Sequence, residues 1–405
     1  MRHIQFQKDN IDLSVTVPAS KSISNRLLVL QKTSGISLEI GNLSHADDTI
    51  LLNDLLQRIE NHHSAEPFIL QCKNCGTAYR FLCAYLACKK GQWILDGSER
   101  MQQRPIKALV DTLTNVGAKI YYSKSQEFPP LQIIGKELNT DFWEINSLQS
   151  SQYVSAIAMI LPMIKNDATI CFSSNNVSLQ YIDMTLGIMQ HIGLDIIRKD
   201  NIINYFHLEK DKNPISVEVE YDWSAAAIWF ILVALSNNVT IFIHGLQNSN
   251  LQKDSVISKW VEPFGVKTEF MTNGIRITKN QHLQPEKLLL DCANNLDLVP
   301  YIAVLCVGLK ISGELKNVEN LTIKESNRIK SLQIELGKIA NIDYVNNNLV
   351  INPREEKFPD TIYFSSHDDH RIAMSVSALA CCIENVYIDN QNCVAKSYPD
   401  FWEQI

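Results

Sequence analysis

The sequence of 405 residues contains no long hydrophobic run and no excess of positive charge. The apolar stretch at 225–235 ("AAAIWFILVAL") is shorter than the roughly 20 residues needed to cross a bilayer, so we expect no membrane helix. The formal net charge of −7 argues against a protein that coats nucleic acid. The first ten residues have neither the apolar core of a signal peptide nor the Arg- and Ser-rich character of a transit peptide.

The ten cysteines lack the pattern of a disulfide framework. They are scattered, and several, such as Cys83 and Cys306, fall within apolar helical patterns, which is typical of buried thiols in a reducing cytoplasm. The segment "CKNC" at 72–75 has the spacing of a redox or zinc motif, but no second pair completes a set of four ligands. We therefore expect a cytoplasmic protein without a metal site.

The chain is too long for one ordinary core, and its 45% hydrophobic and 20% charged residues indicate a globular protein of two domains. Helix-to-strand junctions recur at Gly117, Gly193, Gly265 and Ala340, roughly 75 residues apart. A small residue fits such a junction because the chain leaves the helix in a conformation that a Cβ would hinder. The repeating unit has the pattern βαβαββ, which predicts a modular α/β protein of two bodies with a ligand between them.

Five polar stretches share one position, immediately before or at the start of an apolar helix. A helix N-terminus offers unpaired N–H groups and about half a positive charge, so it can bind an anion. Ser and Thr are also ordinary helix caps, and for any single stretch capping is the alternative. Because all five are rich in Lys, Arg, Gln or adjacent Ser, together they predict anion binding. The stretches are 20–26 ("SKSISNR"), 74–80 ("NCGTAYR"), 150–156 ("SSQYVSA"), 175–183 ("NNVSLQYID") and 367–374 ("HDDHRIAM").

Further cations occur outside these stretches. Arg104 precedes Pro105, and because proline suits the first turn of a helix, a helix is predicted to start there. Lys324 and Arg328 are four residues apart, which predicts a shared helix face with Glu325 beside them; a surface ladder of ion pairs is the alternative. An acidic protein can still bind anions where its cations converge in one cleft.

In order and at compatible spacing, "SKSISNR", "RPI", "SSQ", "KESNR", "DDHRIAM" and "CVAKSYPDFWEQ" resemble the 5-enolpyruvylshikimate-3-phosphate synthase family over nearly the whole chain. The resemblance implies two similar domains, each of three βαβαββ repeats, with the active site in the cleft between them. Residues 1–18 plus 221–405 would form one domain and 19–220 the other.

The resemblance also implies a reaction. The 5-hydroxyl of shikimate 3-phosphate adds to C2 of phosphoenolpyruvate, C3 is protonated, and phosphate leaves. No metal or organic cofactor is expected. The implied partners are these two substrates, with no nucleic acid and no membrane, and the protein is expected to be a monomer.

Roles for individual residues follow from the same resemblance. Asp297 matches the proton acceptor for the 5-hydroxyl, although its sequence context also fits a helix cap, and Glu325 matches the proton donor to C3. Lys21 matches the lysine that touches both substrates. The expected shikimate 3-phosphate site is Lys21, Ser22, Arg26, Ser150, Ser151, Gln152, Ser178, Tyr181, Asp297, Asn320 and Lys324. The expected phosphoenolpyruvate site is Lys21, Asn74, Gly76, Arg80, Arg104, Gln152, Arg328, Arg371 and Lys396.

The sequence departs from the family pattern near these residues. Cys75 stands where alanine is usual, Phe81 where proline is usual, and 179–180 ("LQ") where Lys-Pro is usual. Gly76 is retained, which predicts that glyphosate is admitted, whereas Cys75 and Phe81 are expected to affect the helix beneath it.

Two alternative functions stay open. The sister enolpyruvyl transferase that acts on UDP-N-acetylglucosamine shares the fold, but it lacks the Ser-Lys-Ser start, and Arg26 would meet a carboxylate only in the shikimate substrate. The second alternative is a non-catalytic relative that binds anions, against which the intact Asp297 and Glu325 argue.

Overall fold

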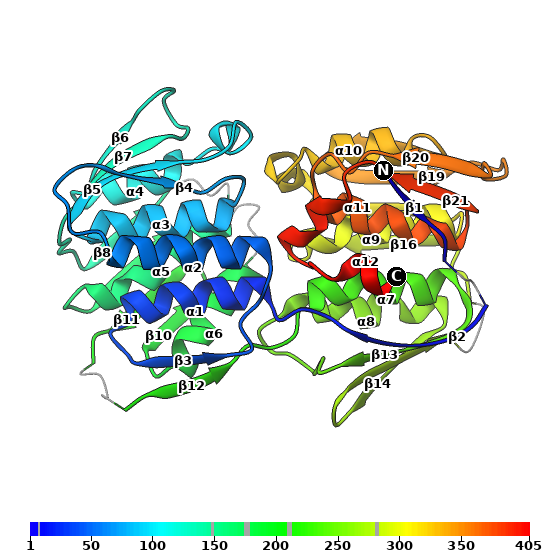
Figure 1. Cartoon of the computed structure of the whole chain (residues 1–405), viewed down its shortest axis with the longest axis horizontal. Helices are drawn as coiled ribbons and strands as arrows, with labels where there is room; N and C mark the ends of the chain where they lie inside the picture. The colour runs from blue at the N-terminus through cyan, green and yellow to red at the C-terminus, as the bar shows by residue number, and fades with distance from the viewer. Residues whose placement is uncertain (7–8, 147–149, 174–178, 209–212, 280–282) are drawn as a thin grey trace. The chain divides into compact units, whose positions relative to one another are not determined.

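The computed structural model describes residues 1–6, 9–146, 150–173, 179–208, 213–279 and 283–405 (Figure 1). The fold is α/β, as predicted, and divides into two compact units. We call Ser20–Val219 the central unit and Met1–Ala19 with Glu220–Ile405 the terminal unit. No helix in the described part of the chain is both long and apolar enough to span a bilayer. That the units act as domains with the boundaries 1–18 plus 221–405 and 19–220 stays a prediction.

The central unit contains three sheets. In its two four-stranded sheets the first two strands are parallel and a hairpin completes the order, as in β4-β5-β7-β6. That sheet consists of β4 (Phe68–Gln71), β5 (Gly91–Asp96), β6 (Lys119–Tyr122) and β7 (Leu131–Gly135), with α3 (Gly76–Cys88) and α4 (Lys107–Asn115). The next has the order β8-β9-β11-β10 and consists of β8 (Phe142–Ile145), β9 (Ala168–Phe172), β10 (Asp195–Lys199) and β11 (Ile202–Phe206), with α5 (Ser151–Ile160) and α6 (Gln180–His191). The third pairs β3 (Leu38–Gly41) with β12 (Ile215–Glu218) and is accompanied by α1 (Lys21–Thr33) and α2 (Asp47–Glu60).

The terminal unit repeats this plan. One sheet has the order β14-β15-β13-β2, from β2 (Asp9–Thr16), β13 (Asn237–His244), β14 (Val266–Met271) and β15 (Gly274–Lys279), with α7 (Trp223–Leu235) and α8 (Ile257–Trp260). A second has the order β16-β17-β19-β18, from β16 (Lys287–Asp291), β17 (Ser312–Lys316), β18 (Ala340–Val345) and β19 (Asn348–Pro353), with α9 (Val299–Gly308) and α10 (Arg328–Leu336). The third has the order β1-β21-β20, from β1 (Arg2–Ile4), β20 (Thr361–Phe364) and β21 (Asn385–Ile388), with α11 (His370–Ser377) and α12 (Phe401–Gln404).

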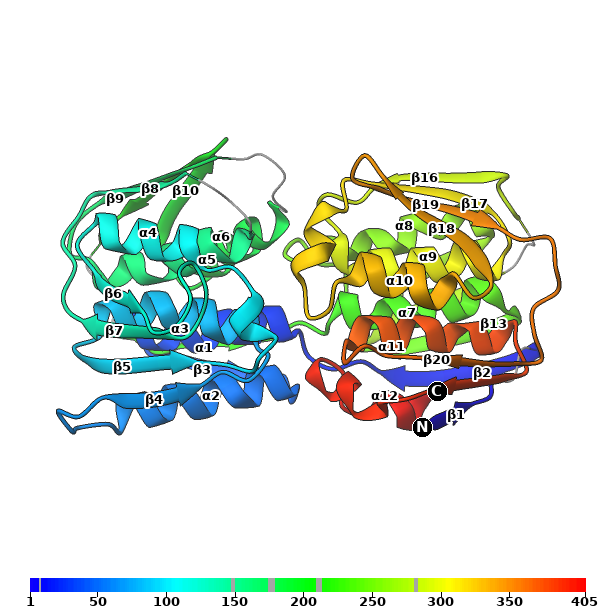
Figure 2. The same cartoon turned by 90° about the horizontal axis from the view of Figure 1, so that it is seen from above.

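The core of the terminal unit is built around helices α7, α9 and α11, which pack together inside the sheets (Figures 1 and 2). Helices α7 and α9 are apolar on all sides because neighbouring elements cover every face, so almost all their residues are buried. The N-terminus of α7 is capped by Asp222, whose side chain accepts a hydrogen bond from the Ala225 amide at 2.9 Å. Because α7 and α9 are buried on all sides, the polar residues at their ends are held in fixed positions.

All four predicted helix-to-strand junctions are present. Gly117, Gly193 and Gly265 have φ of 94°, 83° and 81°, in the left-handed region that a Cβ disfavours. At the fourth, α10 ends at Leu336 and β18 begins at Ala340, which is paired with Pro353 and does not adopt the expected left-handed conformation.

The segment 255–265 ("SVISKWVEPFG") does not form one continuous helix. Helix α8 covers four residues, a 3₁₀ turn precedes it at Lys253–Val256, and another follows at Glu262–Phe264. Pro263 lacks the N–H that would continue the hydrogen bonding of α8, which explains the break.

Candidate active site

The five polar stretches open helices in the part of the chain that the structure describes: α1, α3, α5, α6 and α11 begin within them or at their ends. Capping accounts for part of their composition, since Ser150 Oγ accepts from the Gln152 amide and Asp369 from the Arg371 amide. Ser150 is thus the N-cap of α5 and Ser151 its first residue. Residues 175–178, including the predicted site residue Ser178, lie outside the described residues.

Two arginines of the predicted phosphoenolpyruvate site meet at the N-terminus of α3. A Cβ on Gly76 would lie 2.6 Å from Arg80 Nη1 and 2.7 Å from Arg104 Nη1, so any larger residue would displace at least one of the two guanidinium groups. Arg80 Nη1 donates to Gln152 Oε1 at 2.7 Å, and Gln152 Nε2 donates to Thr77 Oγ1 at 3.0 Å. Two buried guanidinium groups beside a helix N-terminus suit an anion that accepts paired hydrogen bonds, such as a carboxylate or phosphate. We call these residues the Arg80 cluster.

The Arg26 side chain is buried within the central unit. Its guanidinium donates to Thr185 Oγ1 at 2.7 Å, to the Ser22 carbonyl at 2.9 Å and to the Tyr181 carbonyl at 3.2 Å. Burial lowers the pKa of Arg26 to about 10. The ring of Phe81, a departure from the family pattern, lies 5.4 Å from this guanidinium and packs against it. The structure thus brings Arg26 together with Ser22 and Tyr181, as the predicted substrate site requires.

Lys21 is the first residue of α1 and pairs with a carboxylate that the sequence did not single out. Its Nζ lies 3.1 Å from Asp48 Oδ2, and both side chains are mostly buried. Asn74 lies two residues before α3. The prediction that Pro105 starts a helix is wrong, because α4 begins at Lys107 with Ile106 as its N-cap.

A second charged cluster gathers in the terminal unit around Arg328, which is 1% exposed. Arg328 Nη1 lies 2.8 Å from Asp297 Oδ1, Nη2 lies 2.9 Å from Glu325 Oε2, and Nε lies 2.8 Å from Asp369 Oδ2. Lys324 Nζ lies 4.0 Å from Asp297 Oδ1. We call these residues the Arg328 cluster. Lys324 and Arg328 do not share a helix face, because Lys324 has an extended backbone after a 3₁₀ turn and Arg328 is the first residue of α10.

Arg371 joins the same cluster from α11. Its Nη2 lies 3.7 Å from Asp297 Oδ2, its Nη1 donates to the Ser224 carbonyl at 2.7 Å, and the Tyr301 hydroxyl lies 3.5 Å from Nη1. Burial acts to raise the pKa of Asp297, but Lys324, Arg371 and Arg328 together hold it well below its ordinary range. Asp297 is therefore ionised at neutral pH.

Two predicted residues of the terminal unit lie in 3₁₀ turns. Asn320 belongs to the turn Glu319–Ile323, and Lys396 ends the turn Gln391–Lys396. Among the functional groups that sequence reasoning missed, Asp369 had a detectable signal, an acidic cap before "HRIAM". Asp48 had none, because only the folded chain brings it to Lys21.

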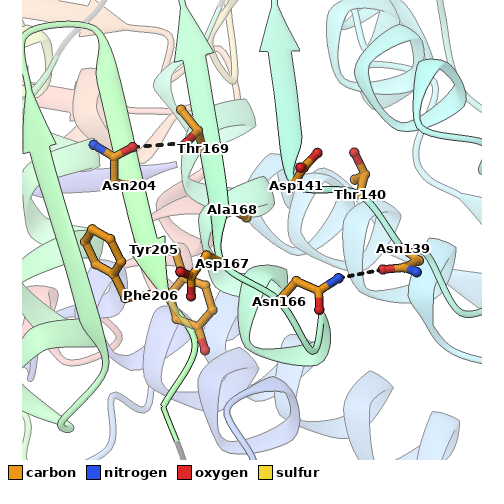
Figure 3. Close-up of a pocket in the computed structure, with 10 residues that line it drawn as sticks. All are labelled: Asn139, Thr140, Asp141, Asn166, Asp167, Ala168, Thr169, Asn204, Tyr205 and Phe206. Atoms are coloured by element: carbon orange, nitrogen blue, oxygen red, sulfur yellow. Dashed lines mark hydrogen bonds between the residues drawn. The ribbon is translucent and has the colours of Figure 1, made fainter.

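None of the predicted site residues that the structure describes lines the hollow shown in Figure 3, a space of about 670 Å³ beside β8, β9 and β11. Its polar side chains largely satisfy one another: Asn166 Nδ2 donates to Asn139 Oδ1 at 3.0 Å, and Thr169 Oγ1 donates to Asn204 Oδ1 at 3.0 Å. We assign it no part in the site.

The ten cysteines are all free thiols. Cys75 Sγ accepts from the Ala78 amide as the N-cap of α3, and burial raises the pKa of Cys72 well above its ordinary value. Within the described residues no group of three or more His, Cys, Asp or Glu side chains gathers as metal ligands do.

Solved structures with the same fold cover 99% of this chain. The EPSP synthase from Acinetobacter baumannii matches with a TM-score of 0.76 at 18% identity, over 96% of its own chain. The enolpyruvyl transferase NikO from Streptomyces tendae matches with a TM-score of 0.72 at 13% identity, over 95% of its chain. At these identities the likeness shows the fold, which is that of two-domain enolpyruvyl transferases.

Closer relatives share the sequence as well. A 3-phosphoshikimate 1-carboxyvinyltransferase from Bacteroides fragilis is 33% identical over 411 residues, which is 100% of this chain and 97% of the relative. One from Shewanella woodyi is 30% identical over 431 residues, 100% of this chain and 99% of the relative. The sequence model of the family described as EPSP synthase (3-phosphoshikimate 1-carboxyvinyltransferase) matches residues 7–405. The chain therefore belongs to the EPSP synthase family.

Proposed function

We propose that the protein transfers the enolpyruvyl group of phosphoenolpyruvate to the 5-hydroxyl of shikimate 3-phosphate and releases phosphate. This reaction leads through the shikimate pathway to chorismate and the aromatic amino acids. The observation that carries the proposal is the Arg328 cluster, in which an ionised carboxylate, Asp297, is surrounded by Lys324, Arg328 and Arg371. Family membership supports the same reaction.

The substrates bring four anionic groups, and the two clusters supply matching cations. Planar guanidinium groups bind carboxylates and phosphates through paired hydrogen bonds, whereas lysine acts as a point charge. In the proposal Arg80, Arg104, Arg328 and Arg371 bind phosphoenolpyruvate. The remaining predicted residues keep the roles given to them above.

Asp297 acts as the proton acceptor. A carboxylate whose pKa is held so low is a weak base, but the cations that lower it are those that bind the substrate anions in this proposal. When a substrate carboxylate or phosphate takes Arg328 or Arg371, Asp297 loses part of its positive surroundings and its basicity rises. Proton abstraction from the 5-hydroxyl is then favoured in the complex with both substrates.

Glu325 acts as the proton donor to C3. Its Oε2 accepts from Arg328 Nη2 at 2.9 Å, so the arginine proposed to bind phosphoenolpyruvate also holds the proposed acid. Occupation of Arg328 by the substrate releases Glu325 to carry a proton. In the second half of the reaction the C3 methyl group loses a proton as phosphate leaves, which restores the enol ether, and positive side chains around the tetrahedral adduct stabilise the charge of the leaving phosphate.

We also propose that the two compact units are the domains of the enzyme and that it works as a monomer in the cytoplasm. The ten free cysteines support a reducing compartment.

The test is phosphate release by the purified protein with phosphoenolpyruvate and either shikimate 3-phosphate or UDP-N-acetylglucosamine, with a chelator present. Release only with the shikimate substrate is expected. Release with the nucleotide sugar would assign the protein to the sister activity, and no release with either would leave the two clusters as binding sites only.

A further inference from the structure

A fourth carboxylate, Asp254, is buried beside the Arg328 cluster and has no role in the mechanism above. It is 3% exposed and belongs to the 3₁₀ turn Lys253–Val256, which packs against α7. Its two oxygens accept hydrogen bonds from two different elements, Ser224 Oγ at the start of α7 and Asn295 Nδ2 at 3.0 Å. Asp254 thus joins the first turn of α7 to the loop that precedes α9.

Each partner of Asp254 leads directly to a group of the proposed site. The carbonyl of Ser224 accepts from Arg371 Nη1 at 2.7 Å, so the position of Ser224 fixes that guanidinium. Asn295 lies two residues before Asp297, and its carbonyl accepts the Leu298 amide at 3.0 Å in the turn that contains Asp297. Asn295 Nδ2 also donates to the Lys253 carbonyl at 3.0 Å, so the 3₁₀ turn holds this side chain twice.

The carboxylate of Asp254 is costly to ionise where it lies, which indicates that the residue does more than stabilise the fold. Burial raises its pKa, and the neighbouring charge of Asp297 raises it further, so each acidic group makes the other costlier to ionise. An apolar residue of similar size would avoid both costs. Such an apolar residue could not accept hydrogen bonds from both Ser224 and Asn295.

We propose that Asp254 is a positioning residue for this enzyme: through Ser224 it sets the Arg371 guanidinium, and through Asn295 it sets the Asp297 carboxylate. The inference rests on the proposed function. It assigns one buried side chain to the joint alignment of the proton acceptor and of a cation that binds phosphoenolpyruvate. Misplacing reacting groups by about 1 Å costs rates on the order of 10²-fold, so this alignment matters to catalysis.

Single substitutions can separate the two hydrogen bonds of Asp254, one with Ser224 and one with Asn295, which we call its two arms. Asp254→Ala removes both and is expected to lower kcat/KM for phosphoenolpyruvate by about 10²-fold, while KM for shikimate 3-phosphate changes less than about two-fold. Asn295→Ala cuts only the arm to Asp297 and is expected to lower kcat. Ser224→Ala cuts only the arm to Arg371 and is expected to raise KM for phosphoenolpyruvate. Asp254→Asn is expected to recover most of the activity, because its oxygen accepts from Asn295 and its amide donates to Ser224 Oγ.

Glu220→Gln is the matched control for a loss of local stability. Glu220 Oε2 accepts from Ser249 Oγ at 2.5 Å and from Gln252 Nε2 at 2.9 Å, so it anchors the same chain segment without contacting Ser224 or Asn295. We expect this variant to shift the midpoint of thermal unfolding without changing kcat or either KM.

Each outcome decides between the explanations. An inactive wild-type protein would contradict the proposed function itself. An active wild type with Asp254→Ala at full kcat/KM would contradict the positioning role alone. The role would also be wrong if Asp254→Asn were as impaired as the alanine variant, if Asn295→Ala and Ser224→Ala changed the same constant, or if Glu220→Gln reproduced the kinetic loss.

Discussion

Replacing Asp369 is expected to destabilise the terminal unit more than any ordinary helix cap would. The side chain is fully buried and accepts from Arg328 Nε at 2.8 Å and Nη2 at 3.2 Å, from Ser326 Oγ at 3.1 Å and from the Arg371 amide at 3.0 Å. Removing one partner of a buried ion pair costs about 3–5 kcal/mol, and a lost cap accounts for about 1 kcal/mol of such a change. We therefore expect Asp369→Ala to lower the free energy of unfolding by about 4 kcal/mol.

The Asp369→Asn variant removes the negative charge but keeps a side chain that can cap α11. Asparagine caps a helix as well as aspartate does, and its oxygen still accepts one hydrogen bond from Arg328, so we expect a loss of about 2 kcal/mol, the size of one hydrogen bond to a charged group. Because Arg328 loses its fixed orientation in both variants, kcat/KM for phosphoenolpyruvate should fall by about ten-fold or more, with little change in KM for shikimate 3-phosphate.

Urea unfolding at pH 7 measures the stability of both variants, and phosphate release measures their kinetics. Asn327→Ala serves as the control, since this exposed side chain caps α10 through the Lys330 amide at 3.1 Å and should cost only about 1 kcal/mol. If Asp369→Ala cost no more than the control, or no more than Asp369→Asn, the buried ion pair would not be what holds Arg328.

Four further outcomes follow from the two clusters. Gly76→Ala places a Cβ 2.6 Å from Arg80 Nη1 and 2.7 Å from Arg104 Nη1. Because this displaces the guanidinium groups, KM for phosphoenolpyruvate should rise by about ten-fold and inhibition by glyphosate should weaken. Unchanged inhibition would show that glyphosate does not bind at the Arg80 cluster. Lys21→Ala should raise KM for both substrates, and normal values for either would remove its dual role. Asp297→Ala should lower kcat by about 10²-fold or more with shikimate 3-phosphate affinity retained, as isothermal calorimetry can check. Because the pKa of Asp297 is depressed in the folded protein, its stabilising effect is complete above the unfolded value of about 3.9 and is lost as the pH falls toward the folded value. The stability difference between the wild type and Asp297→Asn should therefore shrink below about pH 4, and urea unfolding from pH 3 to 7 would reveal a constant difference if this is wrong.

Local features of the sequence predicted the helix N-termini well. The signals that start a helix, such as caps and glycines, depend on residues only a few positions apart in the chain. For this reason α1, α3, α5 and α11 begin where the polar stretches indicate. The same local logic failed for Lys324 and Arg328, which were predicted to share a helix face although α10 begins only at Arg328.

Contacts that depend on tertiary packing could not be read from the sequence. Asp254 reaches Ser224 across 30 residues and Asn295 across 41, and nothing in "LQKDSV" marks it as part of a site. Phe81 was noted only as a departure, yet its ring covers the Arg26 guanidinium. The family resemblance supplied the residues proposed to touch substrates, whereas the residues that hydrogen-bond to them emerged only from the folded chain.

The three carboxylates on Arg328 differ in how readily a substrate can replace them. Asp369 is fully buried, whereas the side chains of Asp297 and Glu325 are 19% and 14% exposed. An anion arriving from solvent therefore competes with the proposed base and the proposed acid, while Asp369 keeps the guanidinium oriented for it. Charge-assisted hydrogen bonds to arginine are strong in a buried site, so a substrate anion can replace a carboxylate on Arg328 and leave the charge of the cluster balanced. Asp297 and Glu325 then regain the capacity to transfer protons only when substrate is bound. In the proposed mechanism, the acid and the base share one arginine and are kept inactive as an ion-pair network until phosphoenolpyruvate binds that arginine.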